Sequence, residues 1–293
     1  MTDRLDGIQP VSFKNPKKKN TMKNKLQLCL VSVALVLFAA SCQKMKRPEL
    51  GSYPKDANPP GGPLKFYAAF DGTTSNPLMN AVDSIRANFA AANPLVSITG
   101  VSGKGIQGDG TKAIKYPSAN DFSSVTSCTI SLWVNNTVNS NTELLFSLAN
   151  KDLWHQSAAF LLLEHATPTK CQLKFALMDK WVEYIDNFNK PLFDGTWHHL
   201  AFTYDGGTST VKVYYDGTEV PLPPGAAGNF ASLGNLNLKN STNLIVGGWN
   251  KHAGVSGPTD SWIGGFSGKM DQFRLYGKAL SASEVLALYN SRL

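Results

Sequence analysis

Residues 195–217, GTWHHLAFTYDGGTSTVKVYYDG, contain two short apolar runs separated by a glycine-rich turn. Large apolar side chains alternate with smaller or polar ones in the first run, at Leu200, Phe202 and Tyr204. Strict alternation indicates an extended strand with one buried face. After the second run, Asp216-Gly217 is a favoured two-residue hairpin turn, because both positions accept a positive φ. This stretch therefore predicts an antiparallel β-hairpin.

Similar runs recur along residues 64–293, separated by Gly, Pro, Asn and Asp. They lie at 128–134, 144–148, 171–177, 243–248 and 266–276, with a polar turn expected over 135–142. Spacings of this kind are typical of β-sandwiches. Only 76–91 and 282–290 look helical, and the second begins with a capping box formed by Ser281 and Glu284. The sequence thus predicts one all-β domain with a short C-terminal helix.

Six strings in this domain resemble those of laminin-G-like jelly-roll domains and occur in the same order. They are FYAAFDG (66–72), GKGIQGDG (103–110), CTISLWV (128–134), GTWHHLAFTYDGGTSTVKVYYDG (195–217), LIVGGW (244–249) and FSGKMDQFRLYGKALSASEVLALY (266–289). The resemblance covers residues 64–293 and indicates the concanavalin A-like lectin and glucanase superfamily. It implies a two-sheet antiparallel jelly-roll sandwich.

Residues 22–42, MKNKLQLCLVSVALVLFAASC, have the layout of a secretory signal. Two lysines precede an apolar stretch over 26–40, which is shorter than the about 20 residues of a spanning helix. The ending resembles the lipobox of bacterial lipoproteins, in which the cysteine is acylated and becomes the first mature residue. Ala39 stands where that family usually has leucine. We expect a signal peptide over 22–41 and lipidation of Cys42, the alternatives being an ordinary signal peptide or an uncleaved anchor.

The segments on either side of this signal carry further expectations. Residues 1–21 are polar and basic, and Met22 opens a complete signal, so we interpret 1–21 as a non-native upstream extension. Residues 42–63 comprise the lipidated cysteine and a flexible tether rich in proline and glycine. The expected protein is an exported Bacteroidetes-type lipoprotein, anchored in the outer membrane by lipid only. Basic residues follow Cys42 where an acidic cluster would mark surface display, so the periplasmic and surface faces both stay open.

Charge excludes a nucleic-acid partner. Of 28 basic and 21 acidic residues, seven and two lie in residues 1–41, which leaves 21 and 19 in the remainder. The expected mature chain is therefore close to neutral, without the basic surface that phosphate binding requires.

Catalysis is not predicted. Glucanases of this fold use two carboxylates, usually from one strand in the pattern Glu-x-Asp-x-x-Glu. None of the five glutamates after residue 63 lies in that pattern, and Glu183 and Asp186 are three apart, on opposite sides of a strand. We expect no catalytic residues and a protein that is not an enzyme.

Histidines and cysteines are interpreted structurally. His198 and His199 follow Trp197 at a strand entry, which in the resembling family is a structural signature. The other histidines are isolated, without the spacing of a zinc site. Cys128 and Cys171 fall on apolar strand faces and are either two buried thiols or a disulfide formed after export.

One metal site is implied by the resemblance. Asp271 would share an inward face with Phe273 and Leu275, and a buried carboxylate needs a partner. In similar domains an acid at this position, with oxygens from the Phe-Asp-Gly segment, binds structural Ca²⁺. Asp71 and Asp271 are the matching positions, and hydrogen bonds to backbone amides are the alternative.

A sugar site combines exposed aromatic rings with polar side chains on loops. Two segments fit this description, although their rings could also cap the sandwich edge. The candidate ligand-binding residues are Trp249, Asn250, His252, Asp260 and Trp262 in one segment, and Trp181, Tyr184 and Asp186 in the other. Trp154, with Asp152 and Gln156, is a third candidate.

These observations favour a non-catalytic carbohydrate-binding module of a cell-envelope lipoprotein, with a glycan or glycoprotein ligand. The alternative is an adhesion or assembly lipoprotein that binds protein partners. A glycoside hydrolase is the least favoured, and fold-level analogy carries much of this choice.

Overall fold

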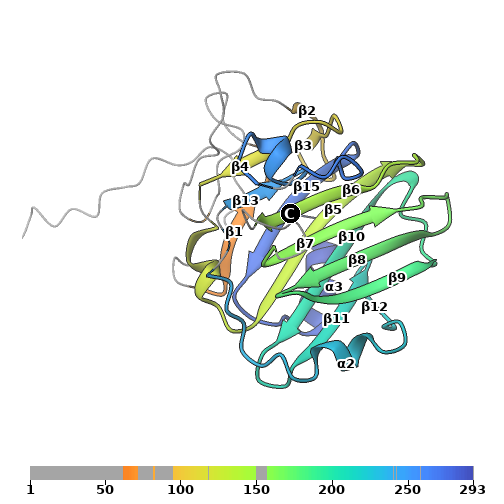
Figure 1. Ribbon diagram of the computed structural model, residues 1–293. Coiled ribbons are helices and arrows are strands. Elements are labelled where there is room, and N and C mark those ends of the chain that lie inside the picture. The colour runs from red at the N-terminus through yellow and green to blue at the C-terminus, as the bar shows by residue number, and fades with distance from the viewer. Residues whose placement is uncertain are drawn as a thin grey trace, which may run out of the picture. The chain divides into compact units, whose positions relative to one another are not determined.

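The computed structural model describes residues 62–71, 82, 95–117, 119–149, 157–239, 241, 243–257 and 259–292. In this part of the chain the strands form two sheets packed face to face (Figure 1). Their pairing is antiparallel, apart from a short parallel contact of β14 with β6. No helix within these residues is long and apolar enough to cross a membrane. The fold is thus the predicted all-β, two-sheet jelly-roll sandwich.

The first sheet has the order β12-β11-β10-β5-β15-β3-β2, with β1 beside β15. Its strands are β1 (Leu64–Ala68), β2 (Val96–Thr99), β3 (Lys104–Gln107), β5 (Cys128–Thr137), β10 (Asp194–Asp205), β11 (Thr210–Tyr215), β12 (Thr218–Val220) and β15 (Lys269–Tyr276).

The second sheet has the order β4-β13-β6-β7-β8-β9, with β14 beside β6. Its strands are β4 (Ile114–Tyr116), β6 (Glu143–Ala149), β7 (Ala159–Glu164), β8 (Cys171–Leu177), β9 (Lys180–Phe188), β13 (Asn243–Val246) and β14 (Gly264–Gly265). The helices are η1 (Asn120–Ser124), α2 (Ala226–Phe230), η3 (Asn250–Ala253) and α3 (Ala282–Ser291).

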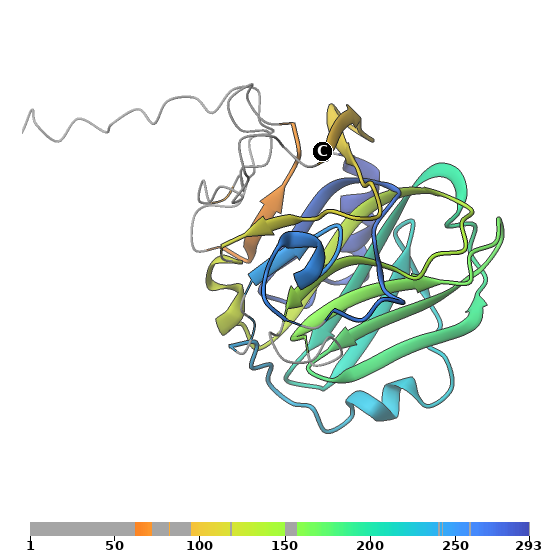
Figure 2. The same ribbon diagram turned by 45° about the horizontal axis from the view of Figure 1, so that its top comes forward.

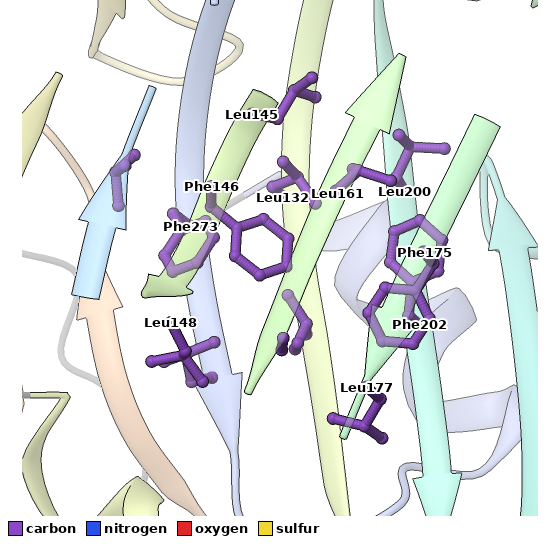
Figure 3. Packing of buried hydrophobic residues seen from close by; sticks show 14 of the residues in the cluster. Leu132, Leu145, Phe146, Leu148, Leu161, Phe175, Leu177, Leu200, Phe202 and Phe273 are labelled. Atoms are coloured by element: carbon purple, nitrogen blue, oxygen red, sulfur yellow. The ribbon is translucent and has the colours of Figure 1, made fainter. Parts of the chain in front are cut away.

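The inner faces of the two sheets form one hydrophobic core (Figure 3). Phe175 of β8 stacks on Phe202 of β10, with ring centroids 4.5 Å apart. Phe146 of β6 packs against Phe273 of β15 at 5.3 Å. Burying each such side chain contributes roughly 1.5–3 kcal/mol. These aromatic pairs join the two sheets across the core.

The β10–β11 hairpin confirms the prediction from residues 195–217. Its register runs from Leu200 opposite Tyr215 to Asp205 opposite Thr210. Asp216 and Gly217 form the next turn, between β11 and β12, where Tyr215 lies opposite Thr218. Their φ values of +48° and +75° are the left-handed pair that this two-residue turn requires.

The C-terminal helix is also confirmed. Ser281 Oγ accepts a hydrogen bond from the Glu284 amide at 3.3 Å, and Glu284 Oε2 accepts one from the Ser281 amide at 2.8 Å. Tyr289 of α3 stacks on Trp133 of β5, with centroids 5.5 Å apart. The helix therefore covers the outer face of the first sheet (Figure 2).

The turn that the sequence predicts over 135–142 begins later in the structure. Asn135 and Asn136 remain in β5, because Asn135 pairs with Trp197 on one side and Lys269 on the other. The connection to β6 is therefore confined to residues 138–142. The expected helix at 76–91 lies outside the described residues except for Val82, and the expectations for 1–21, 22–41 and Cys42 lie outside them entirely.

Cys128 and Cys171 are buried free thiols, which decides between the two alternatives for them. Cys128 lies opposite Tyr204 in the first sheet, whereas Cys171 lies opposite Phe188 in the second. Burial raises the pKa of each thiol to about 12, so the reactive thiolate is suppressed.

Candidate functional site

Polar side chains of three neighbouring strands share the outer face of the second sheet. Glu164 of β7 lies opposite Gln172 of β8, and Lys174 of β8 lies opposite Glu183 of β9. Directly opposed residues point to the same side of a sheet, and the residues between them here enter the core. We call Glu164, Gln172, Lys174, Trp181 and Glu183 the polar face.

One amide group connects the two carboxylates of the polar face. Gln172 Nε2 donates to Glu164 Oε2 at 2.9 Å and to Glu183 Oε1 at 3.2 Å. Lys174 Nζ lies 2.8 Å from the same Glu183 oxygen, and Thr142 Oγ1 donates to Glu164 Oε1 at 3.0 Å. The side chains of Lys174 and Glu183 are 18% and 31% exposed, so a ligand can reach them.

An aromatic ring lies at the end of this network. Trp181 is opposite Ala176 and packs edge-on against Phe160, with centroids 5.5 Å apart. Lys174 Nζ is 5.6 Å from the centroid of the Trp181 ring. Trp181 is partly exposed, so an aromatic surface and hydrogen-bonding groups adjoin on one sheet face.

Of the polar face, the sequence predicted only Trp181. Alternation over 171–177 already places Gln172 and Lys174 on the side away from the core. The sequence does not reveal the register of β7 and β9 against β8, and this register places Glu164 and Glu183 beside Gln172 and Lys174.

Trp249 is buried, and the prediction that it offers an exposed ring is wrong. Only 2% of its surface is accessible, and it packs in a hydrophobic cluster on the outer side of the second sheet. That cluster comprises Leu144, Phe160, Leu162, Ala176, Trp249 and Ile263, with Trp181 packed against it. The two predicted segments therefore converge on one cluster, in which Trp249 supports the layer that carries Trp181.

The other residues of the first predicted segment have separate environments. Asn250 is fully buried, which contradicts its expected exposure. His252 Nδ1 accepts a hydrogen bond from the Trp249 amide at 3.3 Å, and burial lowers the pKa of His252 to about 4. The backbone oxygen of Asp260 accepts from Lys251 Nζ at 2.6 Å. Trp262 is 48% exposed and is the aromatic residue of this segment that a ligand can contact.

The second predicted segment divides between the two faces of β9. Tyr184 is buried in the sandwich core against Phe188, and its hydroxyl donates to the Pro221 carbonyl at 3.0 Å. The expectation that Tyr184 offers an exposed ring is therefore wrong. Asp186 is exposed and lies 2.8 Å from His165 Nδ1, with a φ of +52°. Only Trp181 of this segment belongs to the polar face.

Asp71 and Asp271, the predicted calcium ligands, lie against the same loop. Asp271 Oδ2 accepts from the amides of Val101 and Ser102 at 2.8 and 3.2 Å, and Asp71 Oδ1 accepts from the Lys104 amide at 2.5 Å. Burial and the nearby charge of Asp71 raise the pKa of Asp271 to about 7, against the opposing effect of three backbone amides. Burial raises the pKa of Asp71 as well, so the charged form of both carboxylates is disfavoured.

The side chain of Asp271 lies on the other side of the sheet from Phe273, whereas the sequence predicts that they share the inward face. A bulge at Gln272, where φ is +48°, puts Met270 in the core with Phe273, while Asp271 lies opposite Trp133 on the outer side. Asp271 is nonetheless fully buried. Across the described residues no three His, Cys, Asp or Glu side chains converge, so backbone oxygens would complete any calcium site.

His198 and His199 participate in structural networks. His198 Nδ1 lies 2.9 Å from Asp216 Oδ2, and its Nε2 lies 3.1 Å from Asp194 Oδ1. Burial lowers the pKa of His198, but the two aspartates outweigh it and the pKa is raised. His199 Nε2 is 2.8 Å from Ser131 Oγ, and burial lowers the pKa of His199 to about 3.

The domain is a jelly-roll β-sandwich with an aromatic ring beside a polar network on one outer face. The chain belongs to the concanavalin A-like lectin/glucanases superfamily, because a laminin-G-type model of that superfamily matches residues 108–286. A search of curated protein sequences finds no match.

Solved structures share the fold at low sequence identity. Domain 4 of AbnA, a GH43 extracellular arabinanase from Geobacillus stearothermophilus in complex with arabinotriose, is 21% identical, with a TM-score of 0.51 over 77% of this chain and 98% of that one. The binding domain of Paraclostridial Mosquitocidal Protein 1 is 16% identical, with a TM-score of 0.54 over 78% and 52%. The receptor binding domain of botulinum neurotoxin D is 11% identical, with a TM-score of 0.54 over 78% and 53%. This chain thus spans about half of either toxin domain.

Replacing His198 with Gln tests its ion pairs. A raised folded pKa gives stability that is complete below the unfolded value of about 6.5 and is lost as pH rises through the folded pKa. We expect the substitution to destabilise the protein by about 1 kcal/mol more near pH 6 than near pH 9, measured by urea unfolding. A stability difference that is the same at both pH values would contradict this.

Proposed function

We propose that the protein is a non-catalytic carbohydrate-binding module and that the polar face is its binding site. The observation that carries this proposal is the position of Trp181 beside Lys174, which joins the ring to the hydrogen-bond network of Glu183, Gln172 and Glu164. Sugar rings stack their C–H faces on aromatic rings, while their hydroxyls bond to carboxylates and amides. The polar face supplies both kinds of contact.

The charges of the polar face limit the class of glycan that it can bind. The polar face holds two carboxylates and one ammonium group, Lys174. Acidic sugars would be repelled by the excess negative charge, whereas neutral sugars can donate hydroxyl hydrogens to both glutamates. We therefore infer a neutral oligosaccharide. The arabinanase domain described with arabinotriose supports this choice by analogy.

The paired carboxylates are better suited to binding than to hydrolysis. Glu164 and Glu183 come from two strands, and both accept hydrogen bonds from the same Gln172 amide. Glu183 is also paired with Lys174. A glycosidase needs one carboxyl group to donate a proton and the other to act as nucleophile or base. Here both carboxylates act as acceptors within a network.

Export and anchoring complete the proposal. The signal over 22–41, the small residues before Cys42 and the proline-rich tether support a lipid-anchored protein of the cell envelope. Many anchored copies on one surface would strengthen the attachment to a polymeric glycan through avidity.

Structural calcium at Asp71 and Asp271 is a further part of the proposal. The carboxylates would supply charged ligands, and the cation would offset the repulsion between them.

Glycan binding is tested by screening neutral oligosaccharides with wild-type protein and with Trp181→Ala. Losing a stacked ring should weaken binding at least about tenfold, whereas Leu286→Ala, an exposed apolar site on α3, should leave it unchanged.

Neither wild type nor Glu164→Gln should release reducing sugar. Hydrolysis by wild type alone would establish a glycosidase. A blank screen would favour protein partners, for which exposed Ile185 on edge strand β9 is available.

Anchoring is tested by mass spectrometry of protein from the native cell. We expect a mature chain that begins at Cys42 and carries a lipid-modified cysteine. An unmodified Cys42, a chain that retains Leu26, or peptides from 1–21 would contradict the corresponding expectation.

Calcium at the Asp71 and Asp271 pair is tested by thermal unfolding. We expect a chelator to lower the melting temperature of wild type by a few degrees and that of Asp271→Asn by less, because one ligand charge is gone. An equal effect of the chelator on both proteins would exclude this pair as a calcium site.

A further inference from the structure

A second exposed aromatic ring lies on the outer side of the second sheet, apart from Trp181. Trp262 is 48% exposed and directly precedes Ile263, which is fully buried in the hydrophobic cluster on that side. In the same cluster are Leu144 and Leu162, the outward residues of β6 and β7 that lie opposite each other. The segment that carries Trp262 therefore lies against the same outer face as the polar face.

The hydrogen bonds of the polar face continue past Glu164 toward this segment. Glu164 accepts from Gln172 on one side, and its Oε1 accepts from Thr142 Oγ1 at 3.0 Å on the other. Thr142 directly precedes β6, and its carbonyl accepts from the Gly264 amide at 2.7 Å. Gly264 begins β14, two residues after Trp262. The series of hydrogen bonds thus reaches the strand that follows Trp262.

The strand pairing gives the direction of this path. Glu143 of β6 lies between Gly264 of β14 and Leu163 of β7, and β8 and β9 follow beyond β7 (Figure 1). The path therefore crosses the strands, whereas a line from Trp181 to the exposed Ile185 runs along β9. Neighbouring strands are about 4.8 Å apart, so four spacings place β14 about 19 Å from β9.

The path between the two rings offers hydrogen-bond acceptors within reach of solvent. Thr142 and Glu164 are both partly exposed. An ionised carboxylate has about four acceptor positions. In the described part of the chain, one oxygen of Glu164 accepts from Thr142 and the other from Gln172. Each oxygen therefore has a further lone pair that can accept from a sugar hydroxyl.

We propose that Trp262 is a second aromatic platform of the same binding site, and that the ligand is a linear neutral oligosaccharide crossing the strands from Trp181 to Trp262. This inference rests on the proposed function of the polar face. Three strands separate β9 from β14, so one sugar ring cannot contact both aromatic rings. A chain that reaches both gains the second contact at high effective concentration. The site therefore selects long chains over disaccharides.

The test is isothermal titration calorimetry with linear arabino-, xylo-, gluco- and manno-oligosaccharides, each as a disaccharide and as a hexasaccharide. We expect wild type to bind the hexasaccharide of its preferred sugar at least about tenfold more tightly than the disaccharide. Trp262→Ala should remove this preference and leave the disaccharide affinity unchanged, because the disaccharide stacks on Trp181 alone. Trp262→Tyr keeps a ring and should keep most of the preference.

Ile185→Ala is the matched control, because it removes an exposed apolar side chain on the line along β9. It should bind both lengths as wild type does. The inference is overturned if Trp262→Ala keeps the preference, or if Ile185→Ala loses it instead, since the glycan would then lie along β9. Weaker binding of both lengths by Trp262→Ala would assign this ring a structural role and would also overturn it.

Failure of this inference and failure of the proposed function give different results. Equal affinity of wild type for both lengths would reject the second platform and leave glycan binding at the polar face intact. Binding of none of these glycans by wild type would reject both.

Discussion

The contact between the inner faces of the two sheets, with Phe175 stacked on Phe202 and Phe146 packed against Phe273, constrains the rest of the domain. A strand that gives alternate residues to this core must turn the remaining ones outward. The polar face follows from that constraint, because Leu173 and Phe175 enter the core and Gln172 and Lys174 therefore cannot. The groups of the proposed binding site are thus positioned by core packing, and they lie on strands rather than on loops.

The two outer faces of the sandwich are covered by different elements. Helix α3 covers part of the first sheet, where Tyr289 stacks on Trp133. Over the second sheet, Trp249 and Ile263 bury part of the surface and leave the neighbouring polar face accessible. Trp249 therefore has a supporting role, since it packs in the cluster against which Trp181 lies. An aromatic residue near a binding face can stabilise that face without touching a ligand.

Charged groups placed between or beside the sheets need specific compensation. Asp271 accepts hydrogen bonds from three backbone amides, yet burial and the nearby Asp71 raise its pKa to about 7. Glu143 accepts a hydrogen bond from the Ser267 hydroxyl, and burial likewise raises its pKa. Hydrogen bonds from neighbouring groups therefore offset only part of the cost of burying these two carboxylates.

Alternation and turn chemistry between near neighbours predict the all-β class, the β11–β12 hairpin at Asp216-Gly217 and the capped helix α3 from the amino-acid sequence. The superfamily came from the resemblance of six ordered strings, and exposed aromatic residues were sought on that basis, Trp181 among them. The pairing of the strands, the bulges that interrupt alternation and the groups that cover each ring are long-range properties, which the sequence does not reveal. The bulge at Gln272 reversed the side of Asp271, and the outer cluster buried Trp249. Glu164 and Glu183 are 19 residues apart and meet through β8, a register set by the whole sheet and by no local pattern.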